Sequence, residues 1–148
     1  KARRITPAAQ REAMVRLAIV GEPRFMIERC ELKRQGPSFT LDTVRELRAT
    51  KPGAEWFLII GQDQYANLHT WRDWRDLLAL VTLAVANRPG VTVEPHPDVQ
   101  AAAQHVVPLP MLDIASTDIR ERVAAGQDIG TLVPAGVARY IEANHLYR

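Results

Sequence analysis

Cysteine is almost absent from this sequence of 148 residues. Cys30 stands alone, so no disulfide can form within the chain. A chain without disulfides suits a reducing compartment, and we therefore expect a cytoplasmic protein. No apolar run approaches the roughly 20 residues that span a membrane, and no signal-peptide pattern opens the sequence. These absences argue against a disulfide-stapled secreted domain and against a membrane partner.

The sequence also lacks a large excess of either charge. The 19 basic and 17 acidic residues nearly balance, and the only local excess is Lys1, Arg3 and Arg4. We interpret that excess as a solvated chain end, because a balanced chain does not by itself indicate a nucleic-acid partner. A nucleic-acid binder stays open as an alternative that rests only on this basic start and a calculated pI near 9.0.

Several catalytic patterns are missing as well. His69, His96, His105 and His145 have no metal-ligand spacing, so the sequence predicts no protein metal site. We interpret these histidines as structural or surface residues. There is no Ser-His-acid pattern and no glycine-rich loop that would cradle a phosphate.

Apolar runs alternate with helical patterns along the chain. Residues 56–60 and 82–86 are continuous apolar runs, typical of strands buried on both faces of a parallel sheet. The alternation predicts an α/β fold with a parallel sheet flanked by helices, in a single domain over residues 1–148. The other expected elements are helices from Thr6 to Gly21, from about Thr40 to Lys51, and over 71–80, 117–125 and 135–144, with strands at 25–29 and 106–107.

Ligands of open parallel sheets bind at the carboxyl ends of the strands. At the first such end, Gly61 would let a ligand approach the backbone, and Asp63 has two acceptor oxygens for a ribose diol. Alternatively, Gly61 ends the strand and Asp63 caps a short helix. At the second end, Arg88 has a planar fork that suits phosphate, although the local sequence favours a surface arginine before a Pro-Gly turn.

The segment from Ile114 to Arg120 indicates a possible polyphosphate clamp. A hydroxyl residue, Ser116 or Thr117, is expected to cap a helix whose free backbone N–H groups attract anions. Arg120 would add a full charge one turn later. An ordinary capped helix with a solvated arginine remains the alternative.

Two further candidates stand earlier in the chain. Trp71 and Trp74 share an expected helical stripe with Leu78 and Val81, which favours core packing; the alternative is that one indole stacks on an aromatic ligand. Thr40, at the start of a helix, is either a plain N-cap or a donor for a ligand carboxylate.

Six segments, in matching order and spacing, resemble the bacterial nicotinate-nucleotide adenylyltransferases. They are residues 36–43 for the family's S-Y-T-x-D-T, 57–63 for I-x-G-x-D, 68–74 for its tryptophan segment, 87–90 for R-P-G, 113–120 for I-S-S-T-x-I-R with Ala115 in place of the first serine, and 132–147 for its C-terminus. Each motif alone is weak to moderate, and the match covers essentially the whole chain.

The resemblance implies a Rossmann-like nucleotidyltransferase fold and transfer of the adenylyl group of ATP to nicotinate mononucleotide, with Mg²⁺ accompanying the triphosphate. Its implied site residues are Gly61, Asp63 and Arg88 for ATP, Ser116, Thr117 and Arg120 for the triphosphate and catalysis, Trp71 for the nicotinate ring, and Thr40 with the backbone N–H of Arg72 for the nicotinate carboxylate. A homodimer would also be compatible with it.

The family's G-T-F-D-P-x-H-x-G-H segment has no counterpart in these 148 residues, so we expect the N-terminal βαβ part of the fold to be absent from this sequence. Two alternatives therefore remain beside the main one. The first is a related adenylyltransferase using nicotinamide mononucleotide or phosphopantetheine, and the second is a catalytically inactive nucleotide-binding module.

Overall fold

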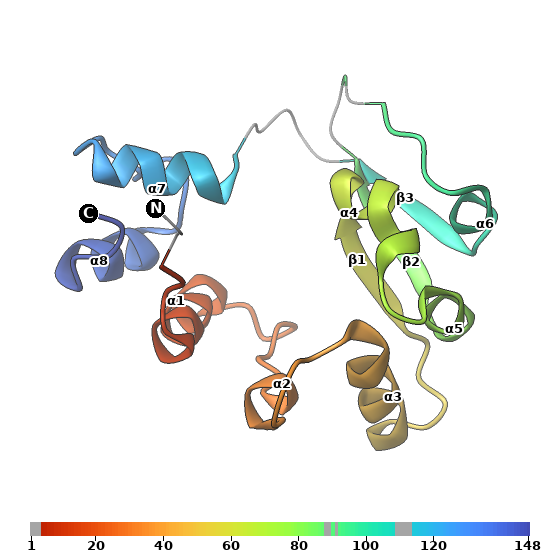
Figure 1. The fold of residues 1–148 in the computed structure, drawn as a ribbon. Coiled ribbons are helices and arrows are strands. Elements are labelled where there is room, and N and C mark those ends of the chain that lie inside the picture. The colour runs from red at the N-terminus through yellow and green to blue at the C-terminus, as the bar shows by residue number, and fades with distance from the viewer. Residues whose placement is uncertain (1–3, 88–89, 91, 109–113) are drawn as a thin grey trace. The chain divides into compact units, whose positions relative to one another are not determined.

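The computed structural model describes residues 4–87, 90, 92–108 and 114–148 (Figure 1). The chain forms two compact units. Unit 1 combines residues 1–32 with residues 113–148, and unit 2 is the uninterrupted segment 33–112. The expectation of a single domain over residues 1–148 stays a prediction, and each unit is described by itself.

Unit 2 is built around a parallel sheet of three described strands in the order β1-β2-β3. Helices alternate with these strands, as the sequence pattern predicts for a parallel sheet. The elements are α3 (Thr40–Thr50), β1 (Phe57–Gly61), α4 (Gln62–Asn67), the 3₁₀ helix η1 (Leu68–Thr70), α5 (Trp74–Leu80), β2 (Thr82–Asn87), α6 (Pro97–Gln100) and β3 (Gln104–Pro108). The α/β fold class is thereby confirmed, and the three strands run side by side (Figure 1).

The core of unit 2 lies on one side of this sheet. Ile60, Leu83 and Val85 point to that side and are 3%, 0% and 4% exposed. Their partners are helix and loop side chains: Leu41 and Val44 of α3, Leu68, Leu77, Val81 and Val99. At about 25 cal/mol per Å² of apolar surface removed from water, this burial is the main stabilising term for the unit.

Burial on both faces is confirmed for β2 but not for β1. Leu83 and Val85 are buried in the core, and the small Ala84 is buried on the opposite face, between Ile59 of β1 and His105 of β3. In β1, by contrast, Phe57 is 46% and Ile59 is 76% exposed, so the side of the sheet away from the core leaves these apolar side chains in solvent. The apolar run 56–60 therefore predicted the strand but not its one-sided burial.

The strand predicted at residues 25–29 is wrong. These residues have no regular structure, and Phe25 and Met26 are 64% and 77% exposed. A strand needs a neighbouring strand to pair its backbone N–H and C=O groups, whatever the β propensity of its side chains. Within the described ranges no strand pairs with this segment. Cys30, expected near that strand, instead begins the short helix α2 (Cys30–Lys33) and is buried.

Unit 1 joins the two ends of the chain. Its helices are α1 (Ala8–Ile19), α7 (Ser116–Ala124) and α8 (Ala135–Ala143). Ile129, Val137 and Ile141 form its buried cluster, and Met14 of α1 packs against them. The Thr6 hydroxyl donates to the Tyr147 hydroxyl at 3.3 Å, which links residues 141 positions apart. No helix in the described ranges is both long and apolar enough to cross a membrane.

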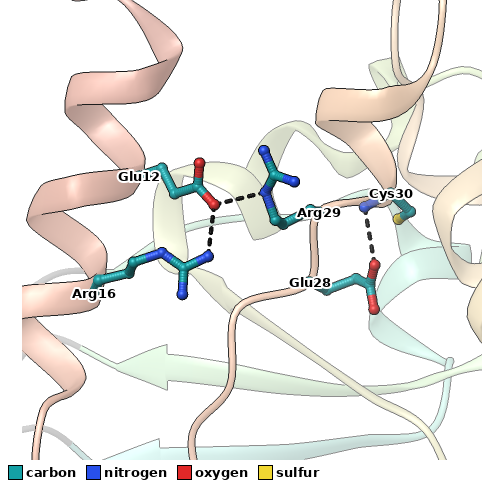
Figure 2. A network of polar contacts seen from close by, with 5 residues as sticks. All are labelled: Glu12, Arg16, Glu28, Arg29 and Cys30. Carbon is teal, nitrogen blue, oxygen red and sulfur yellow. Dashed lines mark hydrogen bonds and ion pairs between the residues drawn. The ribbon is translucent and has the colours of Figure 1, made fainter.

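A polar network ties the irregular segment 25–29 to α1 (Figure 2). Arg16 and Arg29 both donate to the Glu12 carboxylate, at 2.9 and 2.7 Å. The neighbouring Glu28 carboxylate accepts the Cys30 backbone N–H at 2.9 Å. The pKa of Glu12 lies below its ordinary value of 4.5, chiefly through the Arg16 hydrogen bond; desolvation opposes this lowering and Arg29 adds to it. The segment is thus held by side chains where a strand ladder is lacking.

Val85 and Val106 allow a matched test of the core. They are paired in the register of β2 and β3, but Val85 is 4% and Val106 is 62% exposed. We expect Val85→Ala to lower the free energy of unfolding by about 2 kcal/mol, because it removes buried methyl groups and leaves a cavity. Val106→Ala should cost less than about 1 kcal/mol. Urea unfolding measures both, and equal losses would contradict this difference in burial between β2 and β3.

Glu12→Gln tests the polar network through pH. A carboxyl with a lowered pKa stabilises the folded state above its unfolded pKa, and this contribution disappears as pH falls through the folded pKa. We therefore expect the variant to be less stable than the wild type at neutral pH, with the difference shrinking below pH 4.5 and vanishing as pH falls through the lowered pKa of the folded state. Urea unfolding across this range measures it. A difference that persists unchanged in acid would show that the ion pairs are not its cause.

Candidate functional site

The carboxyl ends of β1 and β2 lie at the same edge of the sheet, since the strands are parallel. Gly61, the last residue of β1, is also the N-cap of α4, and its N–H donates to the Gln64 side chain at 3.0 Å. The Gln62 amide donates to the side-chain oxygen of Asn87, the last residue of β2. This hydrogen bond joins the two strand ends, and the sequence interpretation missed both of its members.

Gly61 and Asp63 are both accessible at this edge. A Cβ placed on Gly61 would meet no atom within 4 Å, and its φ of −82° is one that any residue adopts. Neither packing nor backbone strain among the described residues therefore requires glycine here. Asp63 lies in the first turn of α4 but is not its cap, and its exposed carboxylate makes no hydrogen bond or ion pair with a described residue. Arg88, the candidate that follows Asn87, lies outside the described residues.

The start of α7 differs from its predicted form. Its N-cap is Ala115, with extended backbone (φ −122°, ψ 144°) and no capping side chain, so the expected hydroxyl cap is wrong. Ser116 is instead the first helical residue. Hydroxyl residues are preferred at the N-cap, but here the chain enters the helix one residue earlier, so Ala115 occupies that position. As a result the Ser116 hydroxyl has no partner among the described residues, and Thr117 accepts only a 3.3 Å bond from Arg120.

Thr117 and Arg120 line a hollow of about 800 Å³ within unit 1. Arg4, His145 and Arg148 line it too, while Glu121 is the one acidic side chain among its described lining residues. This balance favours an anion. The sequence pointed to the α7 pair but placed Arg4 in a solvated chain end. The spacing of Thr117, Arg120 and Glu121 on one face of α7 is the signal that this face borders a hollow.

The start of α3 holds Thr40 as its first residue, after the N-cap Phe39. The Phe39 carbonyl accepts the N–H groups of Asp42 and Thr43, at 3.1 and 3.3 Å. The backbone N–H and the hydroxyl of Thr40 have no hydrogen-bond partner among the described residues. Thr40 is therefore not a side-chain cap, and it offers two donors at the positive end of the helix.

Trp71 lies outside the helix that the structure forms here. The helix expected over 71–80 begins at Trp74, and Trp71 ends the preceding 3₁₀ turn, donating its N–H to Leu68 at 3.0 Å. Both indoles are half-buried against the core of unit 2, although Leu77, not Leu78, is the fully buried residue of α5. The expected core packing of Trp71, Trp74, Leu78 and Val81 is confirmed, but these residues do not share one helix, because a turn at residues 71–73 interrupts the helical period.

The Thr40 and Trp71 segments meet through their immediate neighbours. The Arg72 guanidinium carbon lies 4.7 Å from the centroid of the Phe39 ring. Both side chains line a hollow of about 250 Å³, whose wall consists of Pro37, Phe39, Leu41, Asp42, Arg45, Arg72 and Asp73. Unit 2 thus brings together two segments more than 30 residues apart in sequence, as a shared subsite would require.

Metal-ligating side chains do not gather in the described ranges, where no group of three or more His, Cys, Asp or Glu residues could hold an ion. His69 and His96 instead form a ring pair with centroids 5.7 Å apart. His96 also meets the Trp74 ring edge at 5.1 Å and accepts the Asp98 backbone N–H at 3.1 Å. These histidines are accounted for by packing and by the capping of α6.

Comparison with known proteins agrees with this architecture. The cytidylyltransferase-like family model matches residues 1–122. A probable nicotinate-nucleotide adenylyltransferase of Methylibium petroleiphilum is 45% identical, over 99% of this chain and 72% of its own length. One of Streptomyces coelicolor is 41% identical, over 99% of this chain and 77% of its own.

Solved structures show a similar fold. Plasmodium falciparum nicotinic acid mononucleotide adenylyltransferase complexed with NaAD superposes with a TM-score of 0.76 at 16% identity, covering 98% of this chain and 76% of that one. The same enzyme complexed with APC gives 0.74, with 97% and 77% covered. The parallel sheet of unit 2 is thus part of a nucleotidyltransferase fold, and this chain belongs to the nicotinate-nucleotide adenylyltransferase family.

Proposed function

We propose that the protein transfers the adenylyl group of ATP to nicotinate mononucleotide, giving nicotinate adenine dinucleotide and pyrophosphate in NAD biosynthesis. The observation that carries this is the 45% identity to a probable nicotinate-nucleotide adenylyltransferase over 99% of the chain. In the reaction, a phosphate oxygen of the mononucleotide attacks the α-phosphorus of ATP in line. The bond from that phosphorus to the bridging oxygen breaks, and pyrophosphate leaves.

This chemistry depends on positioning and charge stabilisation and needs no covalent intermediate. We assign Gly61 and Asp63 to the adenosine, with the Asp63 carboxylate accepting from the ribose hydroxyls. Asp63 is exposed and uncommitted, and the space above Gly61 is open, which supports this assignment. Arg88, which directly follows β2, is proposed to lie along the ATP.

The triphosphate is assigned to Ser116, Thr117 and Arg120, which would also act as the catalytic residues. Free N–H groups at the start of α7, an uncommitted Ser116 hydroxyl and a full charge on Arg120 support this role. They stabilise the negative charge that moves onto the departing pyrophosphate.

The nicotinate is assigned to Thr40, Trp71 and Arg72. Trp71 stacks on the ring, while Thr40 and the backbone N–H of Arg72 receive the carboxylate. Like that of Thr40, the Arg72 backbone N–H has no described hydrogen-bond partner. Donors without an acceptor partner favour an anion over a neutral amide, because charge-assisted hydrogen bonds are about twice as strong as neutral ones.

Mg²⁺ is proposed to accompany ATP. Since the described residues offer no ligand cluster, it would be held largely by phosphate oxygens and water, as Mg²⁺ commonly is. We further propose that the two units make up one nucleotidyltransferase domain, that the protein works in the cytoplasm, and that it forms a homodimer.

The function is tested by pyrophosphate release from the purified protein with ATP, Mg²⁺ and either mononucleotide. We expect one pyrophosphate per dinucleotide formed, and at least about tenfold lower kcat/KM for the amide substrate, because one charge-assisted bond is lost. Chromatography identifies the dinucleotide. Binding of ATP without turnover would indicate an inactive nucleotide-binding module. Equal kcat/KM for the acid and the amide would contradict the proposed carboxylate subsite.

Asp63→Asn tests the adenosine assignment. We expect it to raise KM for ATP by about tenfold or more with little change in KM for nicotinate mononucleotide, because a charged acceptor on the ribose becomes neutral. Asp76→Asn is the matched control, since Asp76 is also an exposed carboxylate in the first turn of a helix. Initial rates at varied ATP measure both variants. Equal effects of the two substitutions would contradict the role of Asp63.

A further inference from the structure

The turn at residues 71–73 is fixed at both ends but not in its middle. Its first residue, Trp71, donates its N–H to Leu68, and its last, Asp73, accepts the Leu77 N–H at 3.2 Å. Asp73 has a φ of 51°, an uncommon backbone conformation for aspartate, and it is the N-cap of α5. Between them, no described residue accepts from the backbone N–H of Arg72.

The Arg72 side chain supplies the missing restraint. Its guanidinium carbon lies 4.7 Å from the Phe39 ring centroid, within the range of a cation–π contact. The guanidinium also pairs with the adjacent Asp73, whose carboxylate lies 3.8 Å from Nε. This ion pair is exposed and therefore weak. Stacking on Phe39 is therefore the contact that links the middle of the turn to the rest of unit 2.

Phe39 is itself firmly placed. Its carbonyl accepts the N–H groups of Asp42 and Thr43, so its backbone is part of the first turn of α3. Leu41 and Val44 anchor that helix in the core, at 3% and 7% exposure. A ring fixed in this way transmits the position of α3, and with it that of Thr40, to the turn that carries Arg72.

We infer that Phe39 is a positioning residue of the nicotinate subsite, whose ring holds the Arg72 guanidinium and thereby orients the Arg72 backbone N–H together with Thr40. This inference rests on the proposed function. In this role the ring acts by coupling the two segments to which the nicotinate carboxylate is assigned. The preference for the acid then depends on an arginine–aromatic contact as well as on the donors themselves.

The inference is tested with Phe39→Leu and Arg72→Met, alone and combined. We expect each single variant to raise KM for nicotinate mononucleotide about fivefold and to reduce the preference for acid over amide, because an exposed cation–π contact is of that strength. The value of kcat and KM for ATP should stay within about twofold. The double variant should be no worse than either single one, since both remove the same contact.

Two controls separate positioning from general damage. Phe39→Tyr keeps the ring face and should restore wild-type KM. Arg75→Met removes a comparable arginine–aromatic contact, that of Arg75 on Trp74 at 4.1 Å, and should leave KM for nicotinate mononucleotide unchanged. Thermal unfolding of every variant checks that the fold persists.

The outcomes distinguish this inference from the proposed function. If the wild type prefers the acid but Phe39→Leu keeps wild-type KM, or if the two single effects simply add, the inference is overturned and the function stands. Equal rises in KM for ATP and for nicotinate mononucleotide would show that Phe39 has only a structural role, and this result would also overturn the inference. A wild type that does not use nicotinate mononucleotide would refute the function, and the inference with it.

Discussion

Parallel pairing of β2 with both β1 and β3 is the constraint on which the arrangement of unit 2 depends. It requires each connection to cross back over the sheet, and the crossing segments supply the helical side chains that bury Leu83 and Val85. It also brings the strands' carboxyl ends to one edge. The Gln62–Asn87 hydrogen bond closes this edge between two neighbouring strands. Burial and ligand geometry thus follow from the same register.

The residues proposed for binding and catalysis lie at helix starts and turns that neighbouring elements hold. Thr40 and Ser116 each occupy the first position of a helix, where backbone donors lack intrahelical partners. Neither hydroxyl makes a capping hydrogen bond, so both are available to a ligand. A capped helix would be more stable by about 1 kcal/mol, and forgoing that bond at two sites is consistent with functional use.

The sequence predicts the parts of this structure that are set by local pattern. The apolar runs predicted the first two strands, Val106-Val107 predicted the third, and helices were correctly expected after Thr6 and from about Thr40. The strand at 25–29 failed because pairing is decided by a neighbour, and the Ser116 cap failed because the path of the chain decides which residue enters a helix. The Phe39–Arg72 contact joins residues 33 positions apart, which no local pattern reveals.

Residue types and their order in the sequence identified the candidate segments, while the structure showed which side chains of these segments contact one another. Thr40 and Trp71 were named from motifs, but Phe39 and the side chain of Arg72 matter through a distance that only the fold supplies. Arg4 was taken for a solvated end because its sequence neighbourhood is basic and irregular. It lines a hollow beside Arg120 because unit 1 draws residues from both halves of the chain.

Unit 1 is discontinuous, and this has a consequence for how the protein is made. Helix α1 packs against α8, so its partner leaves the ribosome only after the whole of unit 2 has been synthesised. Until then the cluster of Ile129, Val137 and Ile141 that Met14 packs against is missing, and α1 by itself is too short to be a stable helix in water. Unit 2 is uninterrupted and can collapse first, which replaces a long flexible loop with a compact body and reduces the entropy lost when the chain ends meet. Completion of unit 1 is therefore a late event of vectorial synthesis, and a nascent chain halted before α8 would present α1 to the chaperones and proteases of the cell.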